Sequence, residues 1–312
     1  MSRIYVIGGA TYDIYASSKN RIIPEDSNIG SVSFSFGGVG RNIAENLAHL
    51  GEKITFISVF GNDGFSRMMY DDCLSLGFDM SYSKVVEGRC PIYLAVLDEN
   101  RNMAVAINDM DVMNELDIEM LERLKDVVED DDYLLVDTNL SNEKIDYIFK
   151  NIKGIKVSDA ISTEKVIRLK DNLSGLSILK VNTFEAEALA GRKLNSEKEI
   201  VSFIRETNDI GTKEVIVTFK EGLYIGSEEG VYLFKHDAYN RNVKNVSGAG
   251  DASLAGYLCG RFHNLSITDS VMVSLANASL TIQSEKAVSE NTIEDIRKQL
   301  KQMNIWYKKI SD

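Results

Sequence analysis

The chain has 312 residues, 44% of them hydrophobic, which is enough for a full core around one large α/β domain. Its 35 basic and 47 acidic residues give a formal net charge of −12. Proteins that bind nucleic acid or anionic membranes carry basic clusters, so this balance argues against both partners.

The N-terminus and the cysteines bear on where the protein resides. The N-terminal sequence MSRIYVIGGATYDIY does not match a signal peptide, and no apolar run approaches the roughly 20 residues needed to span a bilayer. The three histidines show no metal-ligand spacing, and the three cysteines are widely separated: Cys73, Cys90 and Cys259. We therefore expect a cytoplasmic protein with neither a disulfide framework nor a zinc site.

Short apolar runs alternate with longer helical patterns along the chain. Such runs, bounded by turn residues, predict buried strands. Strands that alternate with helices predict a mostly parallel central sheet with helices on both faces, which is a three-layer α/β fold. The expected strands are at 5–7, 54–59, 133–136, 155–157, 178–181 and 215–217.

Apolar residues at helical spacing predict the helices between these strands. Ile43, Leu47 and Leu50 recur on one face, with Gly51 as a C-terminal stop. A second stripe predicts a helix over 116–127, and a third predicts one over 292–309 that packs on the core.

Three segments, at 13–18, 31–36 and 91–108, break the α/β alternation. Val32, Phe34 and Phe36 alternate with serines, a pattern typical of half-exposed antiparallel strands. Apolar runs on either side of the polar turn 98–102 predict a hairpin. We expect a small β-sheet that acts as a lid over a cleft in a single domain spanning 1–312.

A glycine-rich turn, NVSGAGD at 245–251, leads directly into an apolar helix. Helix starts offer unpaired N–H groups, and Gly248 and Gly250 let that backbone approach an anion closely. Asp251 adds a negative charge beside this cradle, which is unfavourable unless the carboxylate takes a proton from an incoming hydroxyl. The turn therefore predicts a phosphoryl-transfer site.

Three further motifs can carry chemistry. The turn GGVGRN at 37–42 opens a helix, so its backbone and the Asn42 amide can meet a polar ligand. Asn182 and Glu185 follow a strand and suit Mg²⁺ held through waters, and an ordinary capping box is the alternative explanation. Asp13, just beyond the first strand, can accept hydrogen bonds from sugar hydroxyls or be an exposed turn residue. The chain contains no P-loop and no Rossmann dinucleotide fingerprint.

Taken together, GGVGRN, N-x-x-E at 182–185 and G-A-G-D at 248–251 resemble, in order and spacing, the ribokinase-like sugar kinases of the PfkB family. The resemblance covers nearly the whole chain and implies transfer of the γ-phosphate of ATP to a sugar or nucleoside hydroxyl, with Mg²⁺. It implies Asp251 as the catalytic base, an anion hole of Gly248, Ala249 and Gly250, and a magnesium-water shell at Asn182 and Glu185.

The resemblance also implies ligand-binding residues. The sugar would meet Asp13, Gly38 and Asn42, and the lid hairpin would bring Asn108 and Asp109 to the base. Candidate ATP contacts are Thr218, Gly222 and Asn277, although helix packing explains Asn277 as well. Asn245 stands where the family usually has Asp, so dependence on K⁺ stays open.

Within the family, the segments around the Gly38 turn and the lid hairpin look most like pseudouridine kinases, which implies phosphorylation of the 5′-hydroxyl of pseudouridine. In other sugar kinases the region of Arg41 is often small or lysine-bearing, so a ribokinase-type or fructokinase-type substrate is less favoured. The alternatives are a kinase of another nucleoside or a free sugar, or a sensor without turnover. Exposed apolar residues on the lid predict a homodimer through that sheet.

Overall fold

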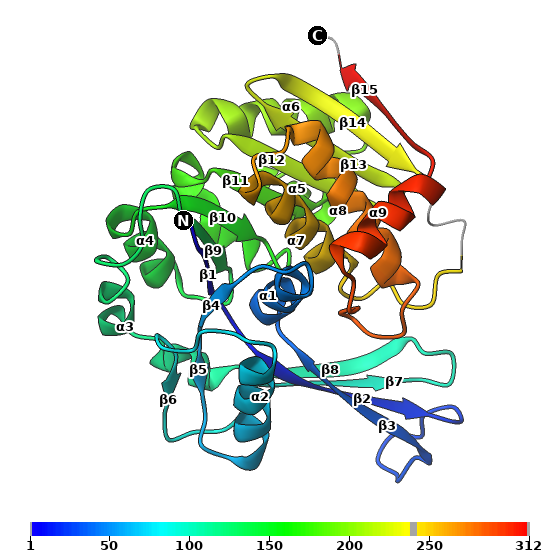
Figure 1. Ribbon diagram of the computed structural model, residues 1–312. Coiled ribbons are helices and arrows are strands. Elements are labelled where there is room, and N and C mark those ends of the chain that lie inside the picture. Colours follow the sequence, from blue (N-terminus) through cyan, green and yellow to red (C-terminus); the bar gives the residue numbers. More distant parts are fainter. Residues whose placement is uncertain (1, 238–241, 311–312) are drawn as a thin grey trace.

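The computed structural model describes residues 2–237 and 242–310. Figure 1 shows a large sheet with helices on both faces and a smaller sheet projecting to one side. The expected three-layer α/β architecture is therefore confirmed.

The large sheet is parallel at one end and antiparallel at the other. Its strands are β1 (Ile4–Ile7), β4 (Ile54–Ile57), β9 (Tyr133–Asp137), β10 (Ile155–Asp159), β11 (Ile178–Asn182), β12 (Glu214–Phe219), β13 (Gly222–Ser227), β14 (Gly230–His236) and β15 (Ile305–Ile310). Their order is β15-β14-β13-β12-β11-β10-β9-β1-β4. The strands from β4 to β12 pair in parallel, so their carboxyl ends share one edge of the sheet. This edge is where α/β folds bind ligands.

Two hydrophobic clusters cover the two opposite faces of the large sheet. In β1, Ile4 and Val6 join one cluster while Tyr5 and Ile7 join the other, because side chains alternate along a strand. The first cluster includes residues of α1 (Val39–His49), α7 (Ala249–Phe262), α8 (Ile267–Ile282) and α9 (Ile293–Gln302). The second includes α3 (Ile118–Glu122), α4 (Asn142–Asn151), the 3₁₀ segment η2 (Val166–Gly175), α5 (Thr183–Ala190) and α6 (Glu197–Ile210). None of the described helices is long and apolar enough to cross a membrane.

The smaller sheet, which we call the lid sheet, contains β2 (Thr11–Ser18), β3 (Gly30–Gly37), β7 (Ile92–Leu97) and β8 (Met103–Asp109) in the order β3-β2-β7-β8. The predicted hairpin is present, with Asp98 accepting backbone hydrogen bonds from Asn100 and Asn102 in its loop. The two hairpins are antiparallel, whereas β2 and β7 pair in parallel. Helix α2 (Gly64–Ser75) packs beside the base of this sheet, where Phe65 contacts Tyr12.

Glycines hold α7 tightly against α8. A Cβ added at Gly256 would lie 2.9 Å from the Cα of Ser274, and one at Gly260 would lie 2.8 Å from the Cα of Ser270. The hydroxyls of Ser253 and Ser274 are 2.8 Å apart across the same contact. Close packing of this kind leaves α7 little freedom to shift.

Two predicted elements near the middle of the chain are wrong in their extent. The strand expected at 54–59 breaks at Ser58, so Val59–Phe60 forms β5, which pairs with β6 (Lys84–Val85). The helix expected over 116–127 shrinks to α3, because Asp117 caps its start by accepting a hydrogen bond from the N–H of Met120, and the 3₁₀ turn η1 (Asp111–Glu115) precedes it. Leu116, Met120 and Leu124 of the predicted stripe are buried nonetheless, Val127 is half-buried, and tighter i to i+3 turns follow α3.

The helix expected over 292–309 is wrong in its second half. Helix α9 ends at Gln302, and Ile305–Ile310 forms β15, antiparallel to β14. Trp306 pairs with Lys235 and is 54% exposed rather than packed in the core. Aromatic and β-branched residues here fit a strand as well as a helix, and β14 offers unpaired backbone groups that only a strand can satisfy.

Candidate active site

The NVSGAGD turn forms the start of α7 as expected. Gly248, the residue before the helix, has a φ of 76°, and a Cβ there would lie 1.8 Å from the carbonyl oxygen of Ala287. Only glycine fits this position. Asp251 lies in the first turn of α7, where the remaining N–H groups of a helix start are available to an anion.

Asp251 is buried and pairs with the first turn of α1. The Asn42 amide donates a hydrogen bond from Nδ2 to Oδ2 of Asp251 at 2.8 Å, while its Oδ1 is buried and has no partner among the described residues. Burial, followed by the negative charge of Asp159, raises the pKa of Asp251 to about 7. A carboxyl group with this pKa can take up and release a proton near neutral pH.

Two charged residues that the sequence interpretation missed lie beside Asp251. Lys180 of β11 and Asp159 at the end of β10 form an ion pair of 2.8 Å, and both side chains are buried. The Lys180 ammonium lies only 2.8 Å from the point where a Cβ on Gly250 would stand, so glycine at 250 lets the cation rest against the start of α7. We call Asp159, Lys180, Glu185 and Asp251 the buried charge cluster.

A third missed residue, Asp137, joins the ends of two elements. It ends β9, is fully buried, and its Oδ2 accepts hydrogen bonds from the N–H groups of Gly9 at 2.8 Å and Gly40 at 3.2 Å. A Cβ at Gly8 would lie 2.4 Å from the same oxygen. Asp137 thus fixes the carboxyl end of β1 against the start of α1.

Asn182 and Glu185 form the capping box that the sequence left as an alternative. Asn182 Oδ1 accepts a hydrogen bond from the N–H of Glu185 at 2.9 Å, and Glu185 Oε2 accepts one from the N–H of Asn182 at 2.8 Å. Burial, followed by the charge of Asp159, raises the pKa of Glu185. Since the capping box uses only Oε2, the second oxygen remains a hard donor of the type that Mg²⁺ and its waters prefer.

The lid sheet sorts its predicted ligand residues by face. Paired residues of a sheet point to the same side, and the register aligns Asp13 with Tyr93 and Tyr93 with Asn108. Asp109 pairs with Ile92 and therefore lies on the opposite face. Asn108 therefore shares the face of Asp13 and Asp109 does not, and the placement of both residues near the base stays a prediction.

Asp13 and Gly38 lie where the lid sheet meets the large domain. Burial raises the pKa of Asp13 to about 6, and its Oδ1 accepts a hydrogen bond from the Thr11 hydroxyl at 2.7 Å. Gly38 begins α1 with a φ of 95°, and a Cβ there would lie 2.4 Å from the carbonyl oxygen of Gly9. The glycine at 38 thus permits close contact between the turn at 37–42 and the backbone of Gly9.

The three candidate ATP contacts differ in their surroundings. Thr218 pairs with Asn182 across adjacent strands, at the ligand-binding edge of the large sheet. Gly222 lies against β14, where a Cβ would stand 2.0 Å from the carbonyl oxygen of Phe234. Asn277 donates to the carbonyl of Ala252 at 2.9 Å and accepts from Asn291, so its contacts correspond to the helix-packing alternative.

Arg41 is buried in the first turn of α1, close enough to Asp13 for its charge to oppose the rise in the pKa of that carboxyl. Its guanidinium pairs with Glu45 at 2.9 Å and with Asp72, and it lies over the ring of Phe36. These contacts connect α1 with α2 and the lid sheet. Arg41 therefore holds this junction together and does not select a substrate by direct contact.

The chain is similar to known kinases along almost its whole length. The model described as pfkB family carbohydrate kinase matches residues 1–294. The chain is 30% identical to a pseudouridine kinase from Escherichia coli (strain K12), in an alignment that covers 90% of this chain and 91% of that protein. It is 24% identical to a guanosine-inosine kinase from Exiguobacterium acetylicum, covering 91% and 95% of the two chains.

The fold is also known from solved structures. A ribokinase from Thermotoga maritima matches with a TM-score of 0.80 at 20% identity, covering 96% of this chain and 100% of that one. At this identity the likeness concerns the fold alone, which is ribokinase-like.

Proposed function

The chain belongs to the PfkB family of carbohydrate kinases, and on that premise we propose that it transfers the γ-phosphoryl group of ATP to the 5′-hydroxyl of pseudouridine. It is an ATP-dependent kinase of a sugar or nucleoside. The observation that carries the mechanism is the buried Asp251, which has a pKa of about 7 and lies in the first turn of α7.

In the proposed reaction, the oxygen of the 5′-hydroxyl attacks the γ-phosphorus while Asp251 accepts the hydroxyl proton. ADP leaves with the electrons of the broken P–O bond. The N–H groups of Gly248 and Gly250 stabilise the charge that develops on the phosphoryl oxygens, and that of Ala249 joins them by leaving its 3.4 Å hydrogen bond to the carbonyl of Val246. Asn42 orients the carboxylate through its 2.8 Å hydrogen bond, and Lys180 opposes a further rise in the pKa of Asp251.

Mg²⁺ and ATP would bind along the carboxyl edge of the large sheet. Glu185 and Asn182 would hold Mg²⁺ through waters, and the ion would neutralise charge on the β- and γ-phosphates. Thr218 is the neighbour of Asn182 in β12, which suits a contact with the nucleotide phosphates. Asn245 accepts a hydrogen bond from the N–H of Ser247 at 2.9 Å and carries no charge, so we propose that K⁺ is not required.

The nucleoside would lie between the lid sheet and the start of α1. Asp13, Gly38 and Asn42 would bind the ribose, and Tyr93 and Asn108, which share the face of Asp13, would meet the base. Amide groups can pair with the N–H and C=O groups of uracil. A pseudouridine kinase among the relatives supports this substrate, and the guanosine-inosine kinase keeps a purine nucleoside as the second candidate.

A substrate panel tests this proposal. Pseudouridine, uridine, inosine, guanosine, ribose and fructose are each supplied with Mg-ATP, and ADP formation is measured with K⁺ and with Na⁺ instead. We expect the highest kcat/KM with pseudouridine, a 5′-phosphate product and no loss of rate in Na⁺. A higher kcat/KM for a purine nucleoside or a free sugar would overturn the assignment, and binding without ADP would indicate a sensor.

We propose further that the protein is a homodimer through the lid sheet. The face opposite Asp13 carries Phe34 and Ile107, which are 58% and 62% exposed, with Val32 and Val105 in the adjoining register row. These residues form a continuous apolar surface, because the register places them on the same side of the sheet. A second copy of the chain would cover it.

A further inference from the structure

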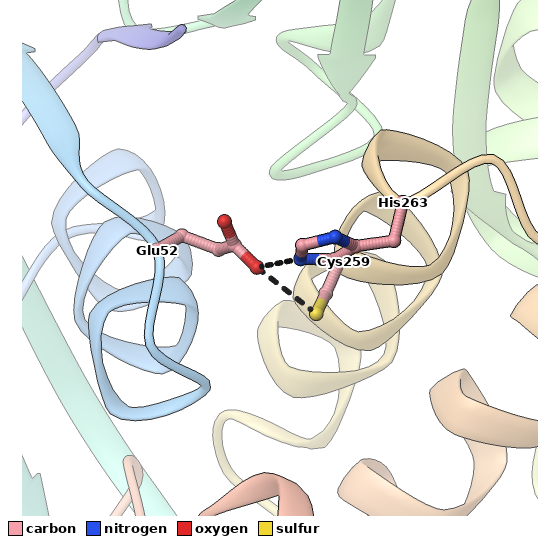
Figure 2. Close-up of side chains that lie close together, drawn as sticks. All are labelled: Glu52, Cys259 and His263. Atoms are coloured by element: carbon pink, nitrogen blue, oxygen red, sulfur yellow. Dashed lines mark hydrogen bonds and ion pairs between the residues drawn. The ribbon is translucent and has the colours of Figure 1, made fainter. Parts of the chain in front are cut away.

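A group of potential metal ligands lies between α1 and α7, at the ends of these helices remote from Asn42 and Asp251. Figure 2 shows Glu52, in the loop after α1, pointing toward Cys259 and His263 of the last turn and the C-cap of α7. Glu52 Oε1 is 2.7 Å from Nε2 of His263 and 3.4 Å from Sγ of Cys259. One atom of each residue lies within 4.8 Å of both others.

The sequence interpretation expected no zinc site, because the cysteines are widely spaced and no cluster of histidines accompanies them. Cys259 and His263 are four positions apart, so they lie on the same side of α7 one turn from each other. Glu52 lies more than 200 positions away from both of them in sequence, so no local sequence pattern reveals that the three side chains meet.

The surroundings of Glu52 favour a cation. Its side chain is only 7% exposed, and among the described residues its one potential cationic partner is His263, which carries a charge only when protonated. Its hydrogen-bond partners are the Cys259 thiol and the His263 imidazole. The carboxyl ends of both α1 and α7, which carry partial negative charge, also point toward this place.

We propose that Glu52, Cys259 and His263 bind a divalent transition metal of the zinc type. Oxygen, sulfur and nitrogen ligands at about 2.0–2.3 Å from Zn²⁺ lie roughly 3.3–3.7 Å from each other in a tetrahedron, so the three side chains need to move by only about 1 Å. His263 is 60% exposed, which leaves an open side for the metal to enter and for a water molecule as fourth ligand. When the metal binds, the Cys259 thiol releases its proton to solvent and the resulting thiolate forms the metal–sulfur bond.

The bound metal would link α1 to α7 at the ends away from the reaction. At the other ends, the Asn42–Asp251 hydrogen bond already joins the two helices. The pair would then be fixed at both ends, and we expect the metal to raise the Tm of the protein.

Metal titration of the full-length protein tests the proposal. After chelator treatment, Zn²⁺ and Co²⁺ are titrated separately with excess Mg²⁺ present to fill hard-oxygen sites. We expect one metal ion per chain, a near-ultraviolet absorption from cobalt bound to thiolate, and a rise in Tm. Cys259→Ser and His263→Gln should each weaken binding on the order of 100-fold, whereas Cys73→Ser, which alters another buried free thiol, should not.

Two results would overturn the site. One is the absence of the cobalt–thiolate absorption, and the other is equal metal affinity in the wild type and His263→Gln. The exposed position of His263 makes that variant informative even where Cys259→Ser fails to fold. Both readouts are independent of kinase activity.

Discussion

The buried charge cluster and the substrate face of the lid sheet are built in opposite ways. Lys180, Asp159 and Asp251 are packed among strands and helices of the large domain, and their hydrogen bonds fix them before any ligand arrives. Asn108 lies exposed on β8, which is an edge strand of the lid sheet and pairs with β7 alone. The difference teaches that the proposed phosphoryl-transfer groups are preorganised by the core, whereas the groups that we propose select the substrate can change on the lid sheet without disturbing that core.

The largest expected effect comes from removing the base. Asp251→Asn keeps an acceptor for Asn42 but cannot take a proton, so kcat/KM should fall about 1,000-fold or more in an ADP-release assay. A loss of less than tenfold, about 1.4 kcal/mol in the barrier, would show that another group is the base.

The same variant should not be less stable. The pKa of Asp251 is about 7 in the folded protein, above its value in the unfolded chain, so its contribution to stability is lost as the pH rises through 7. At pH 8, Asp251→Asn should therefore unfold with a free energy higher by about 1 kcal/mol or more, measured by urea denaturation. Lower stability would mean that the carboxylate supports the fold.

The next prediction concerns the cation in the cluster. Lys180→Met leaves Asp159 buried without its partner, which should cost about 3–5 kcal/mol of stability. Adding Asp159→Asn to this variant should restore part of that loss. If the single and double variants are equally stable, the 2.8 Å pair does not contribute in this way.

The pH profile reports on the same pair. Asp251 must be ionised to act as a base, so wild-type kcat/KM should decline about tenfold per unit below about pH 7. Lys180 lowers the pKa of Asp251, so in Lys180→Met this decline should begin at higher pH. The same pH dependence of kcat/KM in the wild type and in Lys180→Met would show that Lys180 does not set the pKa of the base.

A smaller effect should separate the two faces of the lid sheet. Asn108→Ala removes a proposed hydrogen bond to the base and should raise KM for the nucleoside roughly three- to tenfold, with kcat unchanged. Asp109→Ala is the matched control, because its side chain lies on the opposite face and should leave KM unaltered. A reversed pattern would mean that the nucleoside meets the other face.

The smallest effect on catalysis is expected from the dimer surface. Ile107→Asp places a charge on the exposed apolar face of the lid sheet and should shift the protein to a monomer in analytical ultracentrifugation. Ile210→Asp changes an equally apolar residue, 54% exposed at the end of α6, and should leave the mass unchanged. A monomeric wild type would rule out the proposed dimer.

The sequence predicted those parts of the molecule in which one local pattern has one structural outcome. The apolar runs became parallel strands, and the glycines at 248 and 250 marked a helix start that only a residue without Cβ can form. The hydrogen bond between Asn42 and Asp251 joins residues 209 positions apart, yet both were found because each lies in a glycine-rich turn.

The missed residues depend on which strands become neighbours. Asp137, Asp159 and Lys180 look like ordinary charged residues at or near the ends of apolar runs, and their roles arise only when β9, β10 and β11 lie side by side. A charge inside an otherwise apolar strand, as in Lys180, was the available signal. Asn108 and Asp109 are adjacent in β8, and only the register with β7 and β2 shows which of them shares the face of Asp13.

The two edges of the large sheet are closed by different means. At one edge β15 carries Lys308 and Lys309, whose charges discourage a further strand from joining. At the other, Asp79 pairs with β4 as a single residue, exchanging backbone hydrogen bonds with Ile54 and Phe56. The C-terminal strand thus protects the protein from edge-to-edge aggregation, and a chain shortened before Ile305 would expose β14 to that hazard.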